Sequence, residues 1–235
     1  MPGSVALVGA GEFLPAMDTV DRGLLDATGV NRPRVAILPT ASWPDGDATF
    51  QRWAAMGVEH FTTLGAEVEP VMVRTPADGS DAANLQAVGE ADLIYLSGGK
   101  PAHLLGVLQG SPLGGALCAA HARGAVIAGC SAGAMVLAGR QVDMSRPRVP
   151  FPIKWRSALG LVASAAVLPH YDAWPEALVA LIALQAPRGD AVLGIDEETA
   201  AIGCNGAWQV QGRGRVTVWR GRRRERFRKG EAFRI

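Results

Sequence analysis

The sequence has few cysteines, little net charge and no long apolar run, and each shortage excludes a class of protein. Its three cysteines, Cys118, Cys130 and Cys204, are odd in number and lack Cys-x-x-Cys spacing, which argues against a disulfide framework and a zinc site. No apolar run reaches the roughly 18 residues that a membrane helix needs. Because the stretch from Met1 to Ser4 is neither basic nor leader-like, we expect a cytoplasmic protein without a membrane partner.

Charge is nearly balanced, with 23 Lys and Arg against 22 Asp and Glu. The net charge of +1 gives no overall field that would draw the chain to nucleic acid. Basic residues do gather between Arg220 and Lys229, and in this C-terminal region arginines alternate with Val216, Val218 and Phe227. That alternation is typical of the solvated side of edge strands, so we expect no nucleic-acid partner.

The length of 235 residues and the hydrophobic content of 49% predict one globular domain over 1–235. Strand-like apolar runs alternate with helical patterns, which predicts a three-layer α/β/α fold with a mainly parallel sheet. Residues 205–235 alternate around glycine turns and predict a terminal β-meander along one edge. The proline-rich segment 144–155 is expected to be irregular and to lie near the site. The expected helices are Phe50–Leu64, Ala82–Glu90, Ala102–Leu108, Ser111–Arg123 and Pro175–Gln185.

The most informative stretch is Gly129-Cys130-Ser131-Ala132-Gly133, which matches the pattern Gly-x-Ser-x-Gly. It follows the apolar run Ala125–Ala128 and precedes the helix-forming run Ala134–Leu137, so it stands between a buried strand and a helix. In that setting small residues allow a sharp turn that leaves the serine strained and exposed. Ser131 is therefore a candidate nucleophile.

Two further glycine pairs end predicted strands. Gly98-Gly99 closes a buried strand just before a helix, and the N–H groups there could form an oxyanion hole with that of Ala132. The same pair also suits a plain tight loop. Gly9-x-Gly11 starts like a dinucleotide fingerprint, but Leu14 stands where the third glycine should be, so we expect no nucleotide cofactor.

A nucleophilic serine needs a base, and the chain offers four histidines. His60, His103 and His121 fall on predicted helices, whereas His170 comes at the end of a predicted strand, where ligand sites of open α/β sheets gather. A carboxylate should orient the imidazole. Asp143, Asp172, Glu197 and Glu198 are all candidates, and the residues alone leave this choice open.

Taken together, these blocks resemble the S51 serine peptidases, the family of dipeptidase E and cyanophycinase. The resemblance rests on four blocks in order: Leu96-Ser97-Gly98-Gly99, the Ser131 motif, Pro169-His170-Tyr171 and Gly194–Ala200. It implies a class I glutamine amidotransferase-like fold, Ser131 as nucleophile, His170 as base and the N–H groups of Gly99 and Ala132 as oxyanion donors. It also implies an acid between serine and histidine, which favours Asp143, with Asp172 or a simple dyad as the alternative.

The resemblance implies small or aspartyl peptides as substrates and no cofactor. Two replacements bear on that choice: Lys100-Pro101 stands where family members usually carry Asn, Asp or Gln, and Ala173–Glu176 replaces arginines that often follow the histidine. Lys100 could engage a substrate carboxylate.

Three other functions share some of these sequence features. An α/β-hydrolase esterase shares the serine motif but needs a late histidine, and none follows His170. Glutamine amidotransfer needs a thiolate where Ser131 stands, and Cys130 is out of phase. A non-catalytic binding protein on the same scaffold stays open. A homodimer through an exposed edge strand or surface helices is compatible with the sequence.

Overall fold

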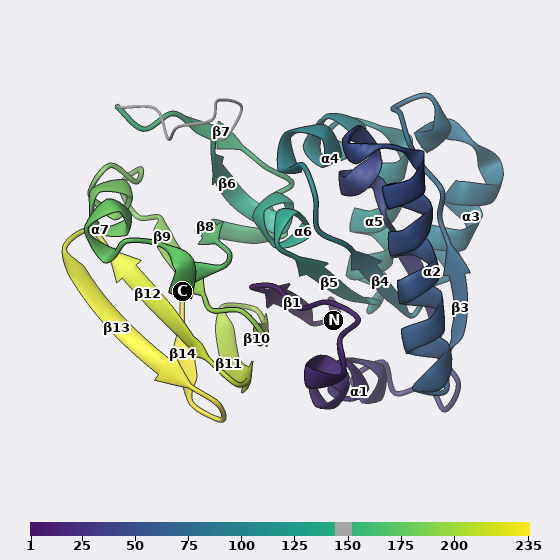
Figure 1. Cartoon of the computed structure of the whole chain (residues 1–235), viewed down its shortest axis with the longest axis horizontal. Coiled ribbons are helices and arrows are strands. Elements are labelled where there is room, and N and C mark those ends of the chain that lie inside the picture. The colour runs from purple at the N-terminus through teal and green to yellow at the C-terminus, as the bar shows by residue number, and fades with distance from the viewer. Residues whose placement is uncertain (144–151) are drawn as a thin grey trace.

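The computed structural model describes residues 1–143 and 152–235, so most of the proline-rich segment predicted to be irregular lies outside the described residues. Two β-sheets form the centre of the molecule (Figure 1). The larger sheet contains, in spatial order, β14 (Ala232–Arg234), β11 (Ala207–Gly212), β10 (Thr199–Cys204), β1 (Val5–Val8), β5 (Val126–Cys130), β4 (Leu93–Leu96), β2 (Arg34–Leu38) and β3 (Glu67–Pro70). The smaller contains β13 (Arg223–Arg228), β12 (Arg215–Arg220), β9 (Ala191–Ile195), β8 (Val162–Leu168), β6 (Ala138–Val142) and β7 (Trp155–Ser157).

Five neighbouring strands of the larger sheet, from β1 to β3, run parallel, and the other three join them antiparallel. Four of these strands, β1, β5, β4 and β2, are buried on both faces, which explains their nearly continuous apolar sequences, whereas edge strand β3 is largely exposed. Ala6 and Val8 pack in one hydrophobic cluster while Val5 and Leu7 pack in another on the opposite face. Side chains that alternate between two apolar layers thus fix the sheet between two sets of helices.

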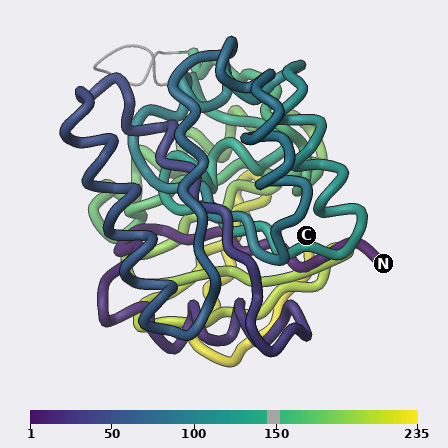
Figure 2. Tube along the Cα trace, turned by 90° about the vertical axis from the view of Figure 1, so that its right-hand side faces the viewer, coloured from purple at the N-terminus to yellow at the C-terminus, as the bar shows by residue number. Residues whose placement is uncertain are grey.

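One face of the larger sheet is covered by α1 (Asp18–Asp26) and α2 (Asp47–Thr63). The other face is covered by α3 (Ala82–Glu90), α4 (Pro101–Leu108), α5 (Pro112–Arg123) and the short α6 (Ala132–Leu137). Figure 2 looks at the molecule from the side of edge strand β3 and shows the dark blue α2 on one flank and the teal helices on the other. The expected α/β fold with helices on both faces is therefore confirmed.

The smaller sheet shares its inner apolar layer with the larger one. Val167 of β8, Leu193 of β9 and Val216 of β12 belong to the same cluster as Leu7 of β1. The outer face is covered by α7 (Glu176–Leu184), whose Val179 and Ile182 pack against Val192. One continuous core therefore fixes the two sheets relative to each other.

The C-terminal strands depart in detail from the expected meander. β11 and β14 do extend one edge of the larger sheet, but β12 and β13 between them belong to the smaller sheet. Three further elements, α1, β6 and β7, were not predicted from the sequence. β6 follows the serine helix directly, with Leu137 ending α6 and Ala138 beginning the strand, so no turn signal separates them.

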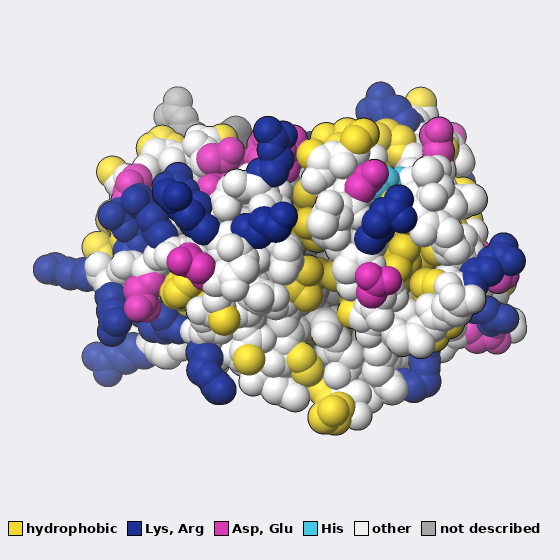
Figure 3. All heavy atoms as spheres, turned by 90° about the horizontal axis from the view of Figure 1, so that it is seen from below, with side chains coloured by type: hydrophobic (Ala, Val, Ile, Leu, Met, Phe, Trp, Pro, Cys, Tyr) yellow, Lys and Arg dark blue, Asp and Glu magenta, His cyan; other side chains and the backbone are white. Residues whose placement is uncertain are grey.

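The basic C-terminal segment forms the β12–β13 hairpin, and Figure 3 shows its side of the molecule rich in Lys and Arg with carboxylates among them. Arg224 and Arg226 pair with Glu176 of α7, and Arg220 and Arg223 pair with Glu225. These two carboxylates offset part of this positive charge. Across residues 1–143 and 152–235, no helix is long and apolar enough to cross a lipid bilayer.

Candidate active site

Ser131 occupies a strained turn between β5 and α6. Its backbone angles, φ 49° and ψ −105°, are unusual for a residue with a side chain. Gly129 makes the turn possible, because a Cβ there would lie 2.5 Å from the backbone of Gly133. The expected strand, sharp turn and helix around the serine are thus present, and the turn brings Ser131 Oγ to 3.0 Å from His170 Nε2.

His170 follows β8 and is also held in a left-handed conformation, with φ 51°. The next residue, Tyr171, is buried and anchors this turn: its ring lies where a Cβ of residue 194 would stand, and its hydroxyl accepts the indole N–H of Trp219 at 3.1 Å. Because Gly194 on β9 has no side chain, the Tyr171 ring can pack against that strand. The imidazole itself is 42% exposed, as access to a substrate requires.

The carboxylate beside His170 is that of Glu197. His170 Nδ1 lies 2.7 Å from Glu197 Oε1, so Nδ1–H can donate to it while Nε2 accepts the serine hydroxyl. The pairing of the two strands explains this meeting. β8 and β9 are parallel with Leu168 opposite Gly194, so the residues just beyond the two strand ends emerge at the same edge.

The other three candidate acids have different partners. Asp143 accepts Arg156 Nη2 at 2.8 Å across the β6–β7 hairpin, so the structure does not bring together the pair that the sequence favoured, Asp143 and His170. Glu198 pairs with Arg213. Asp172 accepts the backbone N–H of Glu197 at 3.0 Å and therefore holds Glu197 in place rather than the imidazole.

The expected oxyanion donors lie beside the serine. Gly99, Ser131 and Ala132 line one hollow of about 200 Å³, and among the described residues no acceptor binds the N–H of Gly99 or of Ala132. Gly98 is turned the other way, because its N–H donates to Glu12 Oε1 at 2.7 Å. Two N–H groups are therefore free at the hollow that contains Ser131.

Glu12 was not predicted. It is only 6% exposed, and its second oxygen accepts the Cys130 thiol at 2.9 Å. Burial raises the pKa of that thiol well above its usual range, and the Glu12 charge adds to the effect. The signal in the sequence was a carboxylate directly after a buried strand and two glycines, where a ligand-side loop begins.

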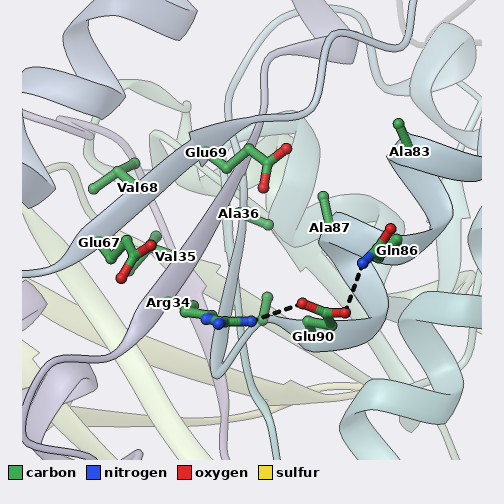
Figure 4. A pocket seen from close by; sticks show the side chains of 11 residues that line it. Arg34, Val35, Ala36, Glu67, Val68, Glu69, Ala83, Gln86, Ala87 and Glu90 are labelled. Carbon is green, nitrogen blue, oxygen red and sulfur yellow. Dashed lines mark hydrogen bonds and ion pairs between the residues drawn. The ribbon is translucent and has the colours of Figure 1, made fainter.

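Lys100 stands at the rim, where Nζ lies 3.0 Å from Asp45 Oδ1. A larger hollow lies elsewhere: it has a volume of about 510 Å³, lies between α3 and strands β2 and β3, and is lined by the ion pair of Arg34 and Glu90 (Figure 4). Ser131 and His170 do not line it. Within the part of the chain that the structure describes, no group of three or more His, Cys, Asp or Glu could hold a metal ion.

Comparison with known proteins agrees with this geometry. The model of peptidase family S51 matches residues 5–210. The chain belongs to peptidase family S51. As a member of this family the chain is a peptidase, a hydrolase. Its likeness to solved structures covers nearly all of the chain.

Two solved structures illustrate the likeness. A peptidase from an acI-B1 Actinobacterium shares 29% of its sequence with this S51 peptidase, with a TM-score of 0.88 over 100% of this chain and 98% of that one. A protein from Listeria monocytogenes EGD-e, provisionally designated peptidase E, shares 19% identity, with a TM-score of 0.62 over 91% of this chain and 100% of that one. No curated protein matches.

Proposed function

We propose that this S51 peptidase hydrolyses short peptides or isopeptides through an acyl-enzyme on Ser131. The observation that carries the proposal is the hydrogen-bonded line Ser131 Oγ, His170 and Glu197, with separations of 3.0 Å and 2.7 Å. Such a line pairs a nucleophile with a base and the base with a group that orients it. The proposal of aspartyl dipeptides or cyanophycin-like isopeptides as substrates rests on the family resemblance alone.

In the first half-reaction, Ser131 Oγ attacks the peptide carbonyl carbon while His170 Nε2 takes the hydroxyl proton. The carbonyl electrons move to oxygen, and the N–H groups of Gly99 and Ala132 donate to the oxyanion. His170 then gives its proton to the leaving nitrogen and the C–N bond breaks. The ester between Ser131 and the acyl group remains.

In the second half-reaction, a water gives a proton to His170 and attacks the ester carbon, and Ser131 leaves with that proton. Throughout, Glu197 accepts Nδ1–H, which keeps Nε2 free to take the serine proton and stabilises the imidazolium. The strained backbone at Ser131 and His170 supports the proposal, since such strain gathers at functional sites.

Labelling with a fluorophosphonate tests the proposal, because these reagents phosphonylate activated serines. We expect one adduct on Ser131 of the native protein, located by peptide mass spectrometry, and none on the Ser131→Ala variant or on denatured protein. The same variant should lose at least about a thousandfold in kcat/KM on any peptide that the wild type cleaves. Absence of labelling above the denatured control would instead favour a non-catalytic binding protein.

A further inference from the structure

The hollow that contains Ser131 has almost entirely apolar walls. Its polar groups are the Ser131 hydroxyl, the His170 imidazole and backbone N–H groups. The remaining side chains are all apolar and come from four segments of the chain: Pro101, Ala132, Met135, Leu168, Pro169 and Trp174. A substrate group that enters here beside the nucleophile meets hydrocarbon and an indole ring.

No cation or amide side chain lines this hollow among the described residues. Two basic residues, Lys100 and Arg156, line a second hollow of about 250 Å³; among the described residues Pro101 is the one that the two hollows share. Each of them is already paired, Lys100 with Asp45 and Arg156 with Asp143. In the proposed mechanism the N–H groups of Gly99 and Ala132 bind the scissile carbonyl oxygen, so a side-chain carboxylate in the first hollow would lose water without a cation to pair with, which is costly.

The apolar walls are held in place before any substrate arrives. Leu168 and Ala132 are 1% exposed and belong to the packed interior. Trp174 donates its indole N–H to the carbonyl of Pro169 at 3.1 Å, which fixes the ring at the mouth. Met135 is the adaptable part of the wall, because its unbranched side chain can fit groups of different shape.

We propose that this hollow receives an uncharged apolar side chain on the acyl side of the scissile bond. The substrates would then be short peptides with Leu, Met or Phe at that position rather than aspartyl peptides. The inference rests on the proposed function, since it takes Ser131 as the nucleophile. Each buried methylene is worth about fourfold in affinity, so the preference for Leu over Ala should be tenfold or more.

Matched peptides test the preference. We would compare kcat/KM for tripeptide amides Xaa-Ala-Ala and acetyl-Ala-Xaa-Ala in which Xaa is Leu, Met, Phe, Ala, Asn or Asp. Cleavage after Leu, Met or Phe should exceed cleavage after Asp by about a hundredfold. Equal rates for Leu and Asp, or a higher rate for Asp, would overturn the proposal.

A binding measurement keeps this inference separate from the proposed function. Calorimetry with the Ser131→Ala protein should give tighter binding of the leucyl peptide than of the aspartyl peptide by tenfold or more. If no peptide is cleaved by the wild type but this difference persists, only the hydrolytic function fails. If the variant binds the two peptides equally, or neither, the apolar site is refuted.

A cation placed in the wall should reverse the preference. Trp174→Arg should raise the ratio of aspartyl to leucyl cleavage at least tenfold, and the same ratio for binding in the Ser131→Ala background. Leu181→Arg is the matched control, because Leu181 is 38% exposed on α7 and does not line the hollow. Pro101→Arg provides a second test that leaves the Trp174 hydrogen bond intact. Failure of both folded variants to change the ratio would contradict the proposal.

Discussion

The Glu12 carboxylate accepts the backbone N–H of Gly98 at 2.7 Å, although the two residues are 86 positions apart. The contact ties the loop after β1 to the loop after β4. Because the other Glu12 oxygen accepts the Cys130 thiol, the same side chain also reaches the end of β5, directly before the nucleophile. One buried carboxylate thus connects three strand ends beneath Ser131.

Glu12→Ala should therefore lower kcat at least tenfold with a smaller change in KM. The variant leaves the Gly98 N–H without its acceptor and frees the loop that carries the Gly99 donor, and oxyanion donors act only in the transition state. The lost hydrogen bonds should also cost about 1–3 kcal/mol of folding free energy, measured by urea unfolding.

Glu12→Gln is the matched control, since its amide oxygen can still accept the Gly98 N–H. It should retain most of kcat. A raised KM with unchanged kcat in Glu12→Ala would show that Glu12 does not position the oxyanion donors.

The choice of acid can be tested by neutralising each carboxylate. Glu197→Gln should lower kcat/KM at least tenfold, because the amide no longer offers the carboxylate charge that favours the imidazolium. Asp143→Asn should have the smaller effect, since Asp143 pairs with Arg156. Steady-state kinetics on one peptide for both variants decide the question, and a larger loss in Asp143→Asn would contradict the assignment of Glu197.

Cys130 should be inert in the folded protein despite its place next to the nucleophile. Its side chain is fully buried, and burial together with Glu12 raises the pKa of the thiol. Iodoacetamide at pH 8 should modify the exposed Cys118 first, although partial burial raises the pKa of that thiol too. Mass spectrometry should find Cys130 alkylated only after denaturation. Its modification in native protein would show that the turn around Ser131 opens and exposes the thiol.

Asp78 should contribute to stability in a pH-dependent way. Backbone N–H donors of Thr75 and Arg74 lower the pKa of its carboxyl below the usual 3.8. The stabilisation by the ionised form is therefore complete above about pH 4 and is lost as the pH falls through the lowered pKa. Asp78→Asn should consequently destabilise the protein at pH 6 and much less at pH 3.

Thermal or urea unfolding at several pH values measures this difference. Asp26→Asn serves as the control, because Asp26 is exposed at the end of α1. An equal stability difference for Asp78→Asn at pH 6 and pH 3 would contradict the expected linkage.

The sequence predicted the parts of this site that depend on local backbone chemistry. The turn at Ser131, the glycine loop at Gly99 and the strand end at His170 each follow from short stretches of apolar and small residues. The helix Ala82–Glu90 was predicted to the residue for the same reason. Such signals lie within a few positions of each other along the chain.

The acid and Glu12 depend instead on which strands become neighbours. Glu197 reaches His170 because β9 pairs with β8, and Asp143 is drawn to Arg156 because β6 pairs with β7. Spacing along the chain contains little information about such pairings, since the free energy that decides them comes from the shared core. The family resemblance favoured Asp143, whereas the packing of the strands places Glu197 beside His170.

Ser131 directly follows β5 of the larger sheet, whereas His170 and Glu197 follow β8 and β9 of the smaller one. In the proposed mechanism the proton therefore moves from Ser131, held by one sheet, to His170, held by the other. The distance between Ser131 Oγ and His170 Nε2 depends on how Leu7, Leu193 and Val216 pack in the core that the two sheets share. A substitution in that core can thus impair catalysis by misaligning donor and acceptor, even where the folded state survives.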